Sequence, residues 1–198
     1  MKSKVIAQGA EAILIQEDEH LIKDRIKKGY RNSELDLKLR KSRTRHESKI
    51  LERAMKIISV PKVSGTSEFK IEMEFIQGKK LSDELDNMPE KEALRVCKLI
   101  GQEVSKLHNF GIIHGDLTTS NMILKNNKVF LIDFGLGFHS VHVEDKAVDI
   151  HLLKEALQSK HFKNWEKYFQ EFIKGYKNEQ VLKQLEKVEK RGRYKQKE

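Results

Sequence analysis

The sequence predicts an α+β fold with two lobes, because three features of the chain agree. Short apolar and β-branched runs separated by turn residues open the chain, which is typical of antiparallel strands. Long stretches with apolar residues three and four positions apart dominate the second half and indicate helices. A strand-like run at 69–76 ends in Gln77-Gly78. We therefore predict a first lobe at 1–76, a helical lobe at 77–190 and a basic tail at 191–198.

The totals predict a water-soluble chain with a real core. The chain has 198 residues, of which 38% are hydrophobic and 35% charged, and this length is enough for one domain or two small lobes. No apolar run approaches the roughly 20 residues of a membrane-spanning helix, and the start lacks a signal-peptide pattern. The single cysteine, Cys97, fits a reducing, cytoplasmic setting and is interpreted as a buried packing residue.

The first half of the chain predicts strands followed by one long helix. Three strands are expected at 5–7, 12–16 and 20–25, with a turn at 17–19. Apolar residues then recur at helical spacing, at Ile50, Leu51, Ala54, Ile57 and Ile58. Val60-Pro61 ends that helix, and the alternating pattern of 69–76 predicts the last strand.

The second half predicts helices around a short hairpin. Residues 89–108 carry an apolar stripe, and Gly111 supplies a stop. Two apolar runs, 122–125 and 128–132, flank Asn126-Asn127, a pair that tolerates the positive φ of a two-residue hairpin turn. Two later helical faces are interpreted as packing, namely Trp165, Phe169, Phe172, Ile173 and Tyr176, and Val181, Leu182, Leu185 and Val188.

The hairpin stands between two polar stretches that together indicate catalysis. Asp116 and Asn121 are separated by four residues, the spacing of a protein-kinase catalytic loop, and Asp133 begins Asp-Phe-Gly after the hairpin. The hairpin would bring Asp133 beside Asn121 to hold Mg²⁺, with Asp116 nearby to receive a proton. The competing interpretation is a turn-rich hairpin whose polar residues only cap turns. His114 is interpreted as structural.

A lysine in the third strand and a glutamate in the long helix fit the same chemistry. Lys23 follows two apolar residues, as does the kinase lysine that holds the α- and β-phosphates of ATP. Glu47 lies three and four positions before the start of the apolar stripe, so its carboxylate is expected inside, beside a cation. Lys23 is the natural partner. The alternatives are a water-facing Lys23 and an exposed Glu47 paired with Arg43 or Lys49.

The other expected nucleotide contacts have weaker signals. Gly9 is the only glycine in the loop where kinases carry a glycine-rich phosphate loop, so backbone approach to phosphates is supported at one point. In the strand 69–76, Met73 would form the rear of the pocket, and the backbone of Glu74 and Ile76 would face adenine. A core methionine is the simpler interpretation of Met73, and both can hold.

Basic residues concentrate in two segments of a chain whose formal net charge is +9. Residues 23–45 contain ten basic and three acidic residues, and residues 183–198 contain seven and three. This favours an anionic macromolecular partner, with RNA ahead of a membrane, over a merely solvated surface. The charges lie in an insertion at 27–45 before the long helix and in the mobile tail 191–198. Whether Arg43 or Arg45 binds the nucleotide instead stays open.

The segment after Asp-Phe-Gly is short. Thirteen residues, 136–148, precede Asp149, which is expected to open a helix and, as in kinases, to hold the backbone amides of the catalytic loop. No room remains for a long activation segment. His139 and His142 lack further ligand spacing, and we interpret them as surface histidines rather than a metal pair.

These residues resemble the small atypical kinase subunit of the KEOPS tRNA-modification complex, a family related to Rio kinases. The resemblance covers nearly the whole chain, at 9–12, Lys23 with Arg25, 27–31, 43–47, 114–121, 133–135, 144–149 and the Arg-Gly-Arg tail. It implies a compact two-lobed kinase-like fold that uses ATP and Mg²⁺, with ATPase and serine/threonine kinase activity. It also implies binding to the threonylcarbamoyl-transferase subunit and other KEOPS subunits, and a role in forming threonylcarbamoyladenosine on tRNA.

Two departures from ordinary protein kinases bear on the reaction. Gly115 replaces the arginine of His-Arg-Asp, so no cation waits for an activation-loop phosphate. Thr118 stands where serine/threonine kinases place a lysine, which weakens charge stabilisation toward a protein substrate. We expect slow transfer to generic proteins, with water or a partner-dictated acceptor as the usual recipient. The alternatives are a small-molecule kinase of the aminoglycoside or choline type and a non-catalytic RNA-binding scaffold.

Overall fold

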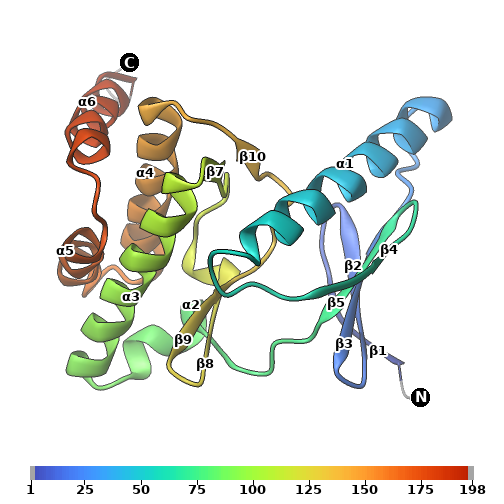
Figure 1. Ribbon diagram of the computed structural model, residues 1–198, viewed down its shortest axis with the longest axis horizontal. Coiled ribbons are helices and arrows are strands. Elements are labelled where there is room, and N and C mark those ends of the chain that lie inside the picture. Colours follow the sequence, from blue (N-terminus) through green and yellow to red (C-terminus); the bar gives the residue numbers. More distant parts are fainter. Residues whose placement is uncertain (1–2, 196–198) are drawn as a thin grey trace.

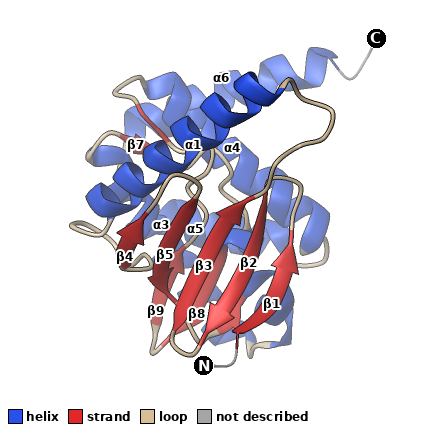
Figure 2. Cartoon of the chain, turned by 90° about the vertical axis from the view of Figure 1, so that its right-hand side faces the viewer, coloured by secondary structure: helices blue, strands red, loops and turns tan. Residues whose placement is uncertain are grey.

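The computed structural model describes residues 3–195 and shows a sheet-rich lobe beside a mostly helical one (Figure 1). The first lobe contains β1 (Ser3–Gln8), β2 (Ala12–Glu17), β3 (His20–Arg25), α1 (Ser33–Ala54), β4 (Val63–Thr66) and β5 (Lys70–Glu74). Its strands form one antiparallel sheet in the order β1-β2-β3-β5-β4, which Figure 2 shows face-on. The predicted α+β class is confirmed.

Helix α1 begins earlier than predicted and absorbs most of the basic segment 27–45. The Asn32 side chain caps α1 by accepting a hydrogen bond from the backbone N–H of Glu34 at 3.0 Å. Acidic residues in the first turn interact favourably with the positive end of the helix dipole. Arg40 pairs with Asp36 one turn earlier at 2.7 Å. The predicted insertion before the helix was therefore wrong for residues 33–45, because caps and ion pairs, rather than an apolar stripe, make this stretch helical.

The C-terminal lobe consists of short strands and the remaining helices. In chain order these are β6 (Lys79–Lys80), α2 (Leu81–Glu84), η1 (Leu85–Asn87), α3 (Glu90–Asn109), β7 (Ile112–Ile113), η2 (Thr119–Asn121), β8 (Met122–Lys125), β9 (Lys128–Leu131), β10 (Phe138–His139), α4 (Val143–Lys160), α5 (Trp165–Gly175) and α6 (Glu179–Lys195). The strands pair in the order β6-β8-β9, and β7 pairs with β10. Asn126 and Asn127 have φ of 50° and 61°, which confirms the predicted hairpin turn.

The core of this lobe forms around α3. The buried residues of α3 include the predicted stripe of Ala93, Val96, Cys97, Ile100, Val104 and Leu107. Burial raises the pKa of the Cys97 thiol to about 12, so Cys97 is a packing residue, as predicted. Helices α5 and α6 cover the side of the lobe that faces away from the N-terminal sheet (Figure 1). No helix within residues 3–195 is long and apolar enough to cross a membrane.

One strand and the start of one further helix also differ from the predictions. Strand β4 was missed because it is only four residues long and Val63 is its only large apolar residue, although its side chains alternate between partly buried and exposed. Helix α4 begins at Val143 rather than at Asp149. Glu144 and Asp145 occupy its first turn, where carboxylates interact favourably with the helix dipole.

The basic C-terminal segment was predicted to be mobile, but α6 continues through Lys195. Arg191 Nη1 lies 2.9 Å from Glu144 Oε1, and this ion pair connects the end of α6 to the start of α4. Residues 191–195 are therefore helical, and the mobility of the tail stays a prediction. Residues 196–198 lie outside the described residues.

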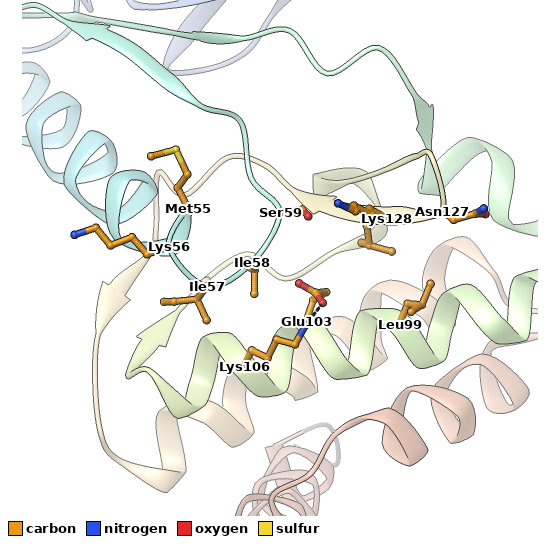
Figure 3. Close-up of a pocket in the computed structure, with 11 residues that line it drawn as sticks. Met55, Lys56, Ile57, Ile58, Ser59, Leu99, Glu103, Lys106, Asn127 and Lys128 are labelled. Carbon is orange, nitrogen blue, oxygen red and sulfur yellow. Dashed lines mark hydrogen bonds and ion pairs between the residues drawn. The ribbon is translucent and has the colours of Figure 1, made fainter.

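A backbone hydrogen bond joins the two lobes at the segment between α1 and β4. The N–H of Leu131 in β9 donates to the carbonyl of Ser59, after α1, at 3.0 Å. A cavity of about 370 Å³ lies between this segment, α3 and the β8–β9 turn (Figure 3). Glu103 and Lys106 of α3 form a 2.6 Å ion pair in its wall. None of the site residues predicted from the sequence lines this rear cavity.

Candidate functional site

The N-terminal wall of the site is built on β3. Lys23 and Arg25 are two residues apart, so both point to the same face of the sheet. Lys23 Nζ lies 2.7 Å from Glu47 Oε1, and Arg25 Nη2 lies 2.5 Å from Glu47 Oε2. Glu47 is 1% exposed, so two cations balance one buried carboxylate. The predicted Lys23–Glu47 pair is confirmed, and the water-facing and locally paired alternatives are wrong.

Asp133 meets Lys23 from the opposite lobe. Lys23 Nζ lies 2.7 Å from Asp133 Oδ1, so one ammonium group bridges two carboxylates. Asp133 has φ of 60°, a left-handed conformation that Asp adopts more readily than most residues. Burial alone would raise the pKa of Asp133, but the Lys23 ammonium and the Gly135 N–H hold it below its usual range. Asp133 is therefore ionised at neutral pH.

Asp116 and Asn121 contact each other across the loop at 114–121, which the sequence predicts to be the catalytic loop. The Asn121 amide nitrogen donates to Asp116 Oδ2 at 2.8 Å and to the Asp116 carbonyl at 3.0 Å. Both contacts use the nitrogen of the Asn121 amide, which turns its oxygen away from Asp116. The backbone N–H of Ile132 donates to the backbone carbonyl of Asn121 at 3.0 Å. The hairpin thus brings Asn121 next to the segment that carries Asp133, as predicted.

A buried carboxylate holds the first half of the catalytic loop. Asp149 accepts the N–H of His114 and of Gly115, each at 2.9 Å. His108 Nε2 lies 3.0 Å from Asp149, and its Nδ1 lies 2.9 Å from the Tyr176 hydroxyl. Burial alone would raise the pKa of Asp149, but these hydrogen bonds hold it below its usual range. The predicted role of Asp149 in holding the loop is confirmed.

His114 packs inside the protein, as interpreted from the sequence. It is fully buried, its Nε2 lies 3.0 Å from the Ile132 carbonyl, and its ring centroid lies 4.6 Å from that of Phe134. The Asp116 N–H approaches His114 Nδ1 at 3.3 Å. The ring therefore orients the loop backbone.

Gly115 has a steric explanation that the sequence did not reveal. Its φ is +77°, and a Cβ at this position would lie 2.3 Å from the Leu136 carbonyl oxygen. Both the left-handed conformation and the close approach exclude a side chain. The arginine of ordinary kinases cannot occupy this backbone.

Two adjoining cavities contain the predicted site residues. The first, about 280 Å³, lies at the strand β5 end and is lined by Met73, Glu74, Ile76, Glu47 and Asn121 among others. The second, about 430 Å³, lies under the loop at Gly9 and reaches Asp116. Lys23 and Asp133 line both cavities. All nine residues predicted from the sequence are thus brought together, and their roles in binding and catalysis stay predictions.

The basic segment holds the loop at Gly9 over the second cavity. Glu11 accepts Arg31 at 2.9 Å and Arg43 at 2.7 Å, and Lys28 donates to the Ala10 carbonyl. These contacts join residues far apart in the sequence, so motif reasoning missed them. Arg43 lines the second cavity, whereas Arg45 is not among its lining residues.

Arg25 is the main site residue that the analysis of individual motifs missed. It is 5% exposed and lines the second cavity. Its position two residues after Lys23 in a predicted strand was the available signal, because alternate residues share a face. The kinase motifs pair the buried glutamate with a single lysine, so they gave no reason to assign a role to Arg25.

The two histidines beyond the catalytic loop are separate from this site. His139 Nε2 lies 2.5 Å from Arg53 Nη1 on the surface. Within the described part of the chain, no group of three or more His, Cys, Asp and Glu side chains is arranged to hold a metal ion. Lys23 and Arg25 of β3 line the same cavities as Asp116, Asn121 and Asp133, and such a set of groups suits a bound polyphosphate with a divalent cation.

Comparison with known proteins identifies the family. The model of the RIO domain matches residues 16–148. The chain is 44% identical to the KEOPS complex subunit Bud32 of Pyrococcus abyssi, over 98% of this chain and 97% of that protein. It is 39% identical, over 98% of its length, to a probable bifunctional tRNA threonylcarbamoyladenosine biosynthesis protein of Methanobrevibacter smithii, of which it spans 37%. The chain therefore belongs to the RIO domain family and, within it, to the family of the KEOPS subunit Bud32.

Proposed function

We propose that the protein binds Mg²⁺ and ATP between its lobes and catalyses transfer or hydrolysis of the γ-phosphate. One observation carries this proposal: Lys23 Nζ lies 2.7 Å from both Glu47 and Asp133. This contact joins the strand of one lobe to the Asp-Phe-Gly turn of the other, inside a cleft. Membership of the RIO domain family supports ATP use.

The two cavities divide the nucleotide between them. Met73, 5% exposed, forms the rear wall of the first cavity, and the backbone of Glu74 and Ile76 binds the adenine edge. Lys23 binds the α- and β-phosphates at the junction of the cavities. Arg25 keeps Glu47 paired while Lys23 contacts phosphate, and the backbone at Gly9 covers the phosphates from above.

Asp133 and Asn121 are the residues that would hold Mg²⁺. Asp133 is ionised, and Asn121 directs its amide nitrogen toward Asp116, so oxygen ligands of the type that Mg²⁺ prefers line the first cavity. Mg²⁺ commonly takes one or two protein ligands beside substrate phosphates. When bound, it neutralises charge that develops on the phosphates.

Asp116 orients the attacking oxygen and receives its proton. Its carboxylate lines the second cavity and is fixed by the 2.8 Å bond from Asn121. Thr118 supplies no cation for the transferring group, and Gly115 cannot carry one. Water, or an acceptor set by a partner protein, is therefore the usual recipient, and serine/threonine phosphorylation of generic proteins is slow.

In the cell, we infer that the protein is a cytoplasmic KEOPS subunit that supports threonylcarbamoyladenosine formation on tRNA. The identity to a KEOPS complex subunit over nearly the full length of both proteins supports this, as does the bifunctional threonylcarbamoyladenosine biosynthesis relative. Its partners are the threonylcarbamoyl-transferase subunit, other KEOPS subunits and tRNA. The tRNA would contact the basic segments 27–45 and 191–198.

ATP turnover with and without Mg²⁺, tRNA and the transferase subunit tests this function. We expect Mg²⁺-dependent hydrolysis that Asp116→Ala abolishes while nucleotide binding persists, and that Lys23→Ala impairs together with binding. Stimulation by tRNA should fall steeply as salt rises, because Lys and Arg contacts to phosphates release counterions. Wild-type turnover in a purified Asp116→Ala variant would refute the catalytic assignment.

A small-molecule kinase is the alternative that shares His-Gly-Asp. Such an enzyme needs helices that shape a substrate pocket over the cleft. Here α5 packs against α3, and α6 packs against α4, on the far side of the helical lobe (Figure 1). An assay for ATP-dependent phosphorylation of a panel of small alcohols tests this alternative. The other alternative, a non-catalytic RNA-binding scaffold, would be favoured by tRNA binding without any ATP turnover.

A further inference from the structure

A second buried histidine contacts the other half of the catalytic loop. His161, the C-cap residue that follows α4, is 2% exposed. Its Nε2 lies 3.0 Å from Thr119 Oγ1, and its Nδ1 lies 2.6 Å from Asp86 Oδ2. Thr119 belongs to η2, two residues before Asn121. The three side chains come from η1, η2 and the end of α4, so only the fold brings them together.

Asp86 is oriented by two further donors. The Tyr168 hydroxyl and the Asn164 amide nitrogen each donate to Asp86 Oδ1 at 3.0 Å. Burial alone would raise the pKa of Asp86, but these bonds and the His161 contact hold it below its usual range. An ionised Asp86 accepts a hydrogen bond from His161 Nδ1 and so orients the ring. The other ring nitrogen, Nε2, then faces the Thr119 hydroxyl, which can donate or accept.

The Asp-His-Thr order resembles a nucleophilic triad, but its burial excludes that use. Thr119 is 1% exposed and His161 is 2% exposed, so no substrate can reach the hydroxyl. A nucleophile must meet the reacting atom at close range. The three residues must therefore act on the loop itself.

We propose that Asp86, His161 and Thr119 form a positioning relay that sets Asn121 for phosphoryl transfer, an inference that rests on the proposed function. Thr119 and Asn121 lie on the same 3-10 turn, so the hydroxyl bond fixes the turn that carries the Asn121 side chain. Asp149 fixes the beginning of the same loop through backbone amides. Asp116 thus lies between the two anchored positions, and Asn121 follows the second by two residues.

Variants of His161 separate its two contacts. In His161→Asn the amide nitrogen falls near the Nδ1 position, which keeps the bond to Asp86 and loses the bond to Thr119. In His161→Gln the amide reaches the Nε2 position and keeps a partner for Thr119. We expect kcat for Mg²⁺-dependent ATP hydrolysis to fall about tenfold or more in His161→Asn, because small displacements at a reacting site have large effects, and to stay within about threefold in His161→Gln.

Thr119 variants test the same relay without touching the histidine. Thr119→Val keeps the shape and removes the hydroxyl, so kcat should fall as in His161→Asn, together with a higher Mg²⁺ concentration for half-maximal rate. Thr119→Ser keeps the hydroxyl and should retain most activity. His142→Gln, at the exposed start of α4, is the matched control and should leave both parameters unchanged.

Amide hydrogen exchange at residues 119–122 without nucleotide gives a readout besides activity. Exchange should accelerate in His161→Asn and Thr119→Val but not in His161→Gln, while melting temperatures confirm that each variant is folded. Wild-type exchange and kcat in folded His161→Asn and Thr119→Val would overturn the relay. If the wild-type protein shows no Mg²⁺-dependent hydrolysis, the proposed function fails, whereas the exchange pattern still decides whether the relay anchors the loop.

Discussion

The two walls of the cleft are held by different interactions. On the N-terminal side, a sheet and α1 are joined by ion pairs, in which Glu47 binds Lys23 and Arg25. On the C-terminal side, the loop at 114–121 is held by hydrogen bonds. Two of its backbone N–H groups donate to Asp149, and Thr119 shares a hydrogen bond with His161. The residues of the ion pairs line the cavities that would receive nucleotide, whereas Asp149 and His161 line neither cavity.

This difference indicates which wall responds to ligand. Lys23 is shared between Glu47 and Asp133, so phosphate binding must redistribute its contacts. Arg25 keeps a buried cation on Glu47 throughout. Asp149 and His161, which hold the loop at 114–121, line neither cavity. That wall would therefore be arranged before a ligand binds, as electrostatic preorganisation requires.

The largest effect is expected from loss of the buried Asp149 carboxylate that holds the loop at 114–121. Asp149→Asn replaces an acceptor of three hydrogen bonds with an amide whose nitrogen would face an N–H donor. We expect a loss of about 3–5 kcal/mol in the free energy of unfolding, measured in urea. Glu155→Gln, an exposed change on the same helix, should cost under about 0.5 kcal/mol. Equal stabilities for the two variants would contradict this account of the C-terminal wall.

Glu47→Gln probes the opposite wall. It leaves Lys23 and Arg25 beside a neutral amide in a site that is 1% exposed, and we expect a loss of about 3 kcal/mol in the free energy of unfolding. Asp133→Asn removes the other partner of Lys23, but that side chain is half exposed, so its loss should cost at most about 1 kcal/mol. Comparing the two unfolding curves shows whether burial decides the strength of these pairs, and a larger loss in Asp133→Asn would refute that view.

Gly115→Ala tests the steric requirement of the loop. The left-handed conformation alone costs roughly 1–2 kcal/mol for a residue with a Cβ, and the approach to Leu136 forces a shift of the backbone. We expect lower stability in urea together with lower kcat. Gly29→Ala is the matched control, since a Cβ there meets nothing within 4 Å. Full activity and stability in Gly115→Ala would mean that the loop tolerates another conformation.

The smallest expected effect is on how the free energy of unfolding depends on pH. The pKa of Asp149 is lower in the folded protein than in the unfolded chain. Its contribution is therefore complete above the unfolded value of about 3.9 and is lost as pH falls through the lower folded value. Stability measured from about pH 5 downward should decline less steeply in Asp149→Asn than in the wild type. An identical slope would assign the acid sensitivity to other carboxylates.

Sequence reasoning succeeded where the signal is local. The Asn126-Asn127 turn needs only residues that adopt positive φ, and it brings Asn121 to the segment of Asp133. The pairing of Lys23 with Glu47 followed from a strand position and a helix face. Each inference used a period of two or of about 3.6 residues, which a short window displays.

It failed where the reason lies in a distant part of the chain. The short, irregular strand β4 depends on β5 for its pairing, and α1 begins at a cap rather than at an apolar stripe. The bonds from Arg31 and Arg43 to Glu11, and the hydrogen bond between His161 and Thr119, join residues far apart in the sequence. No local pattern contains such contacts.

By itself, the sequence determined the fold class, the family resemblance and the polar residues gathered around one cleft, because these depend on periodicity and motif spacing. Tertiary structure decided which cations share Glu47, why Gly115 cannot carry a side chain, and which buried groups hold the catalytic loop. The reason is physical, since burial, steric approach and hydrogen-bond partners are properties of segments that meet only after folding.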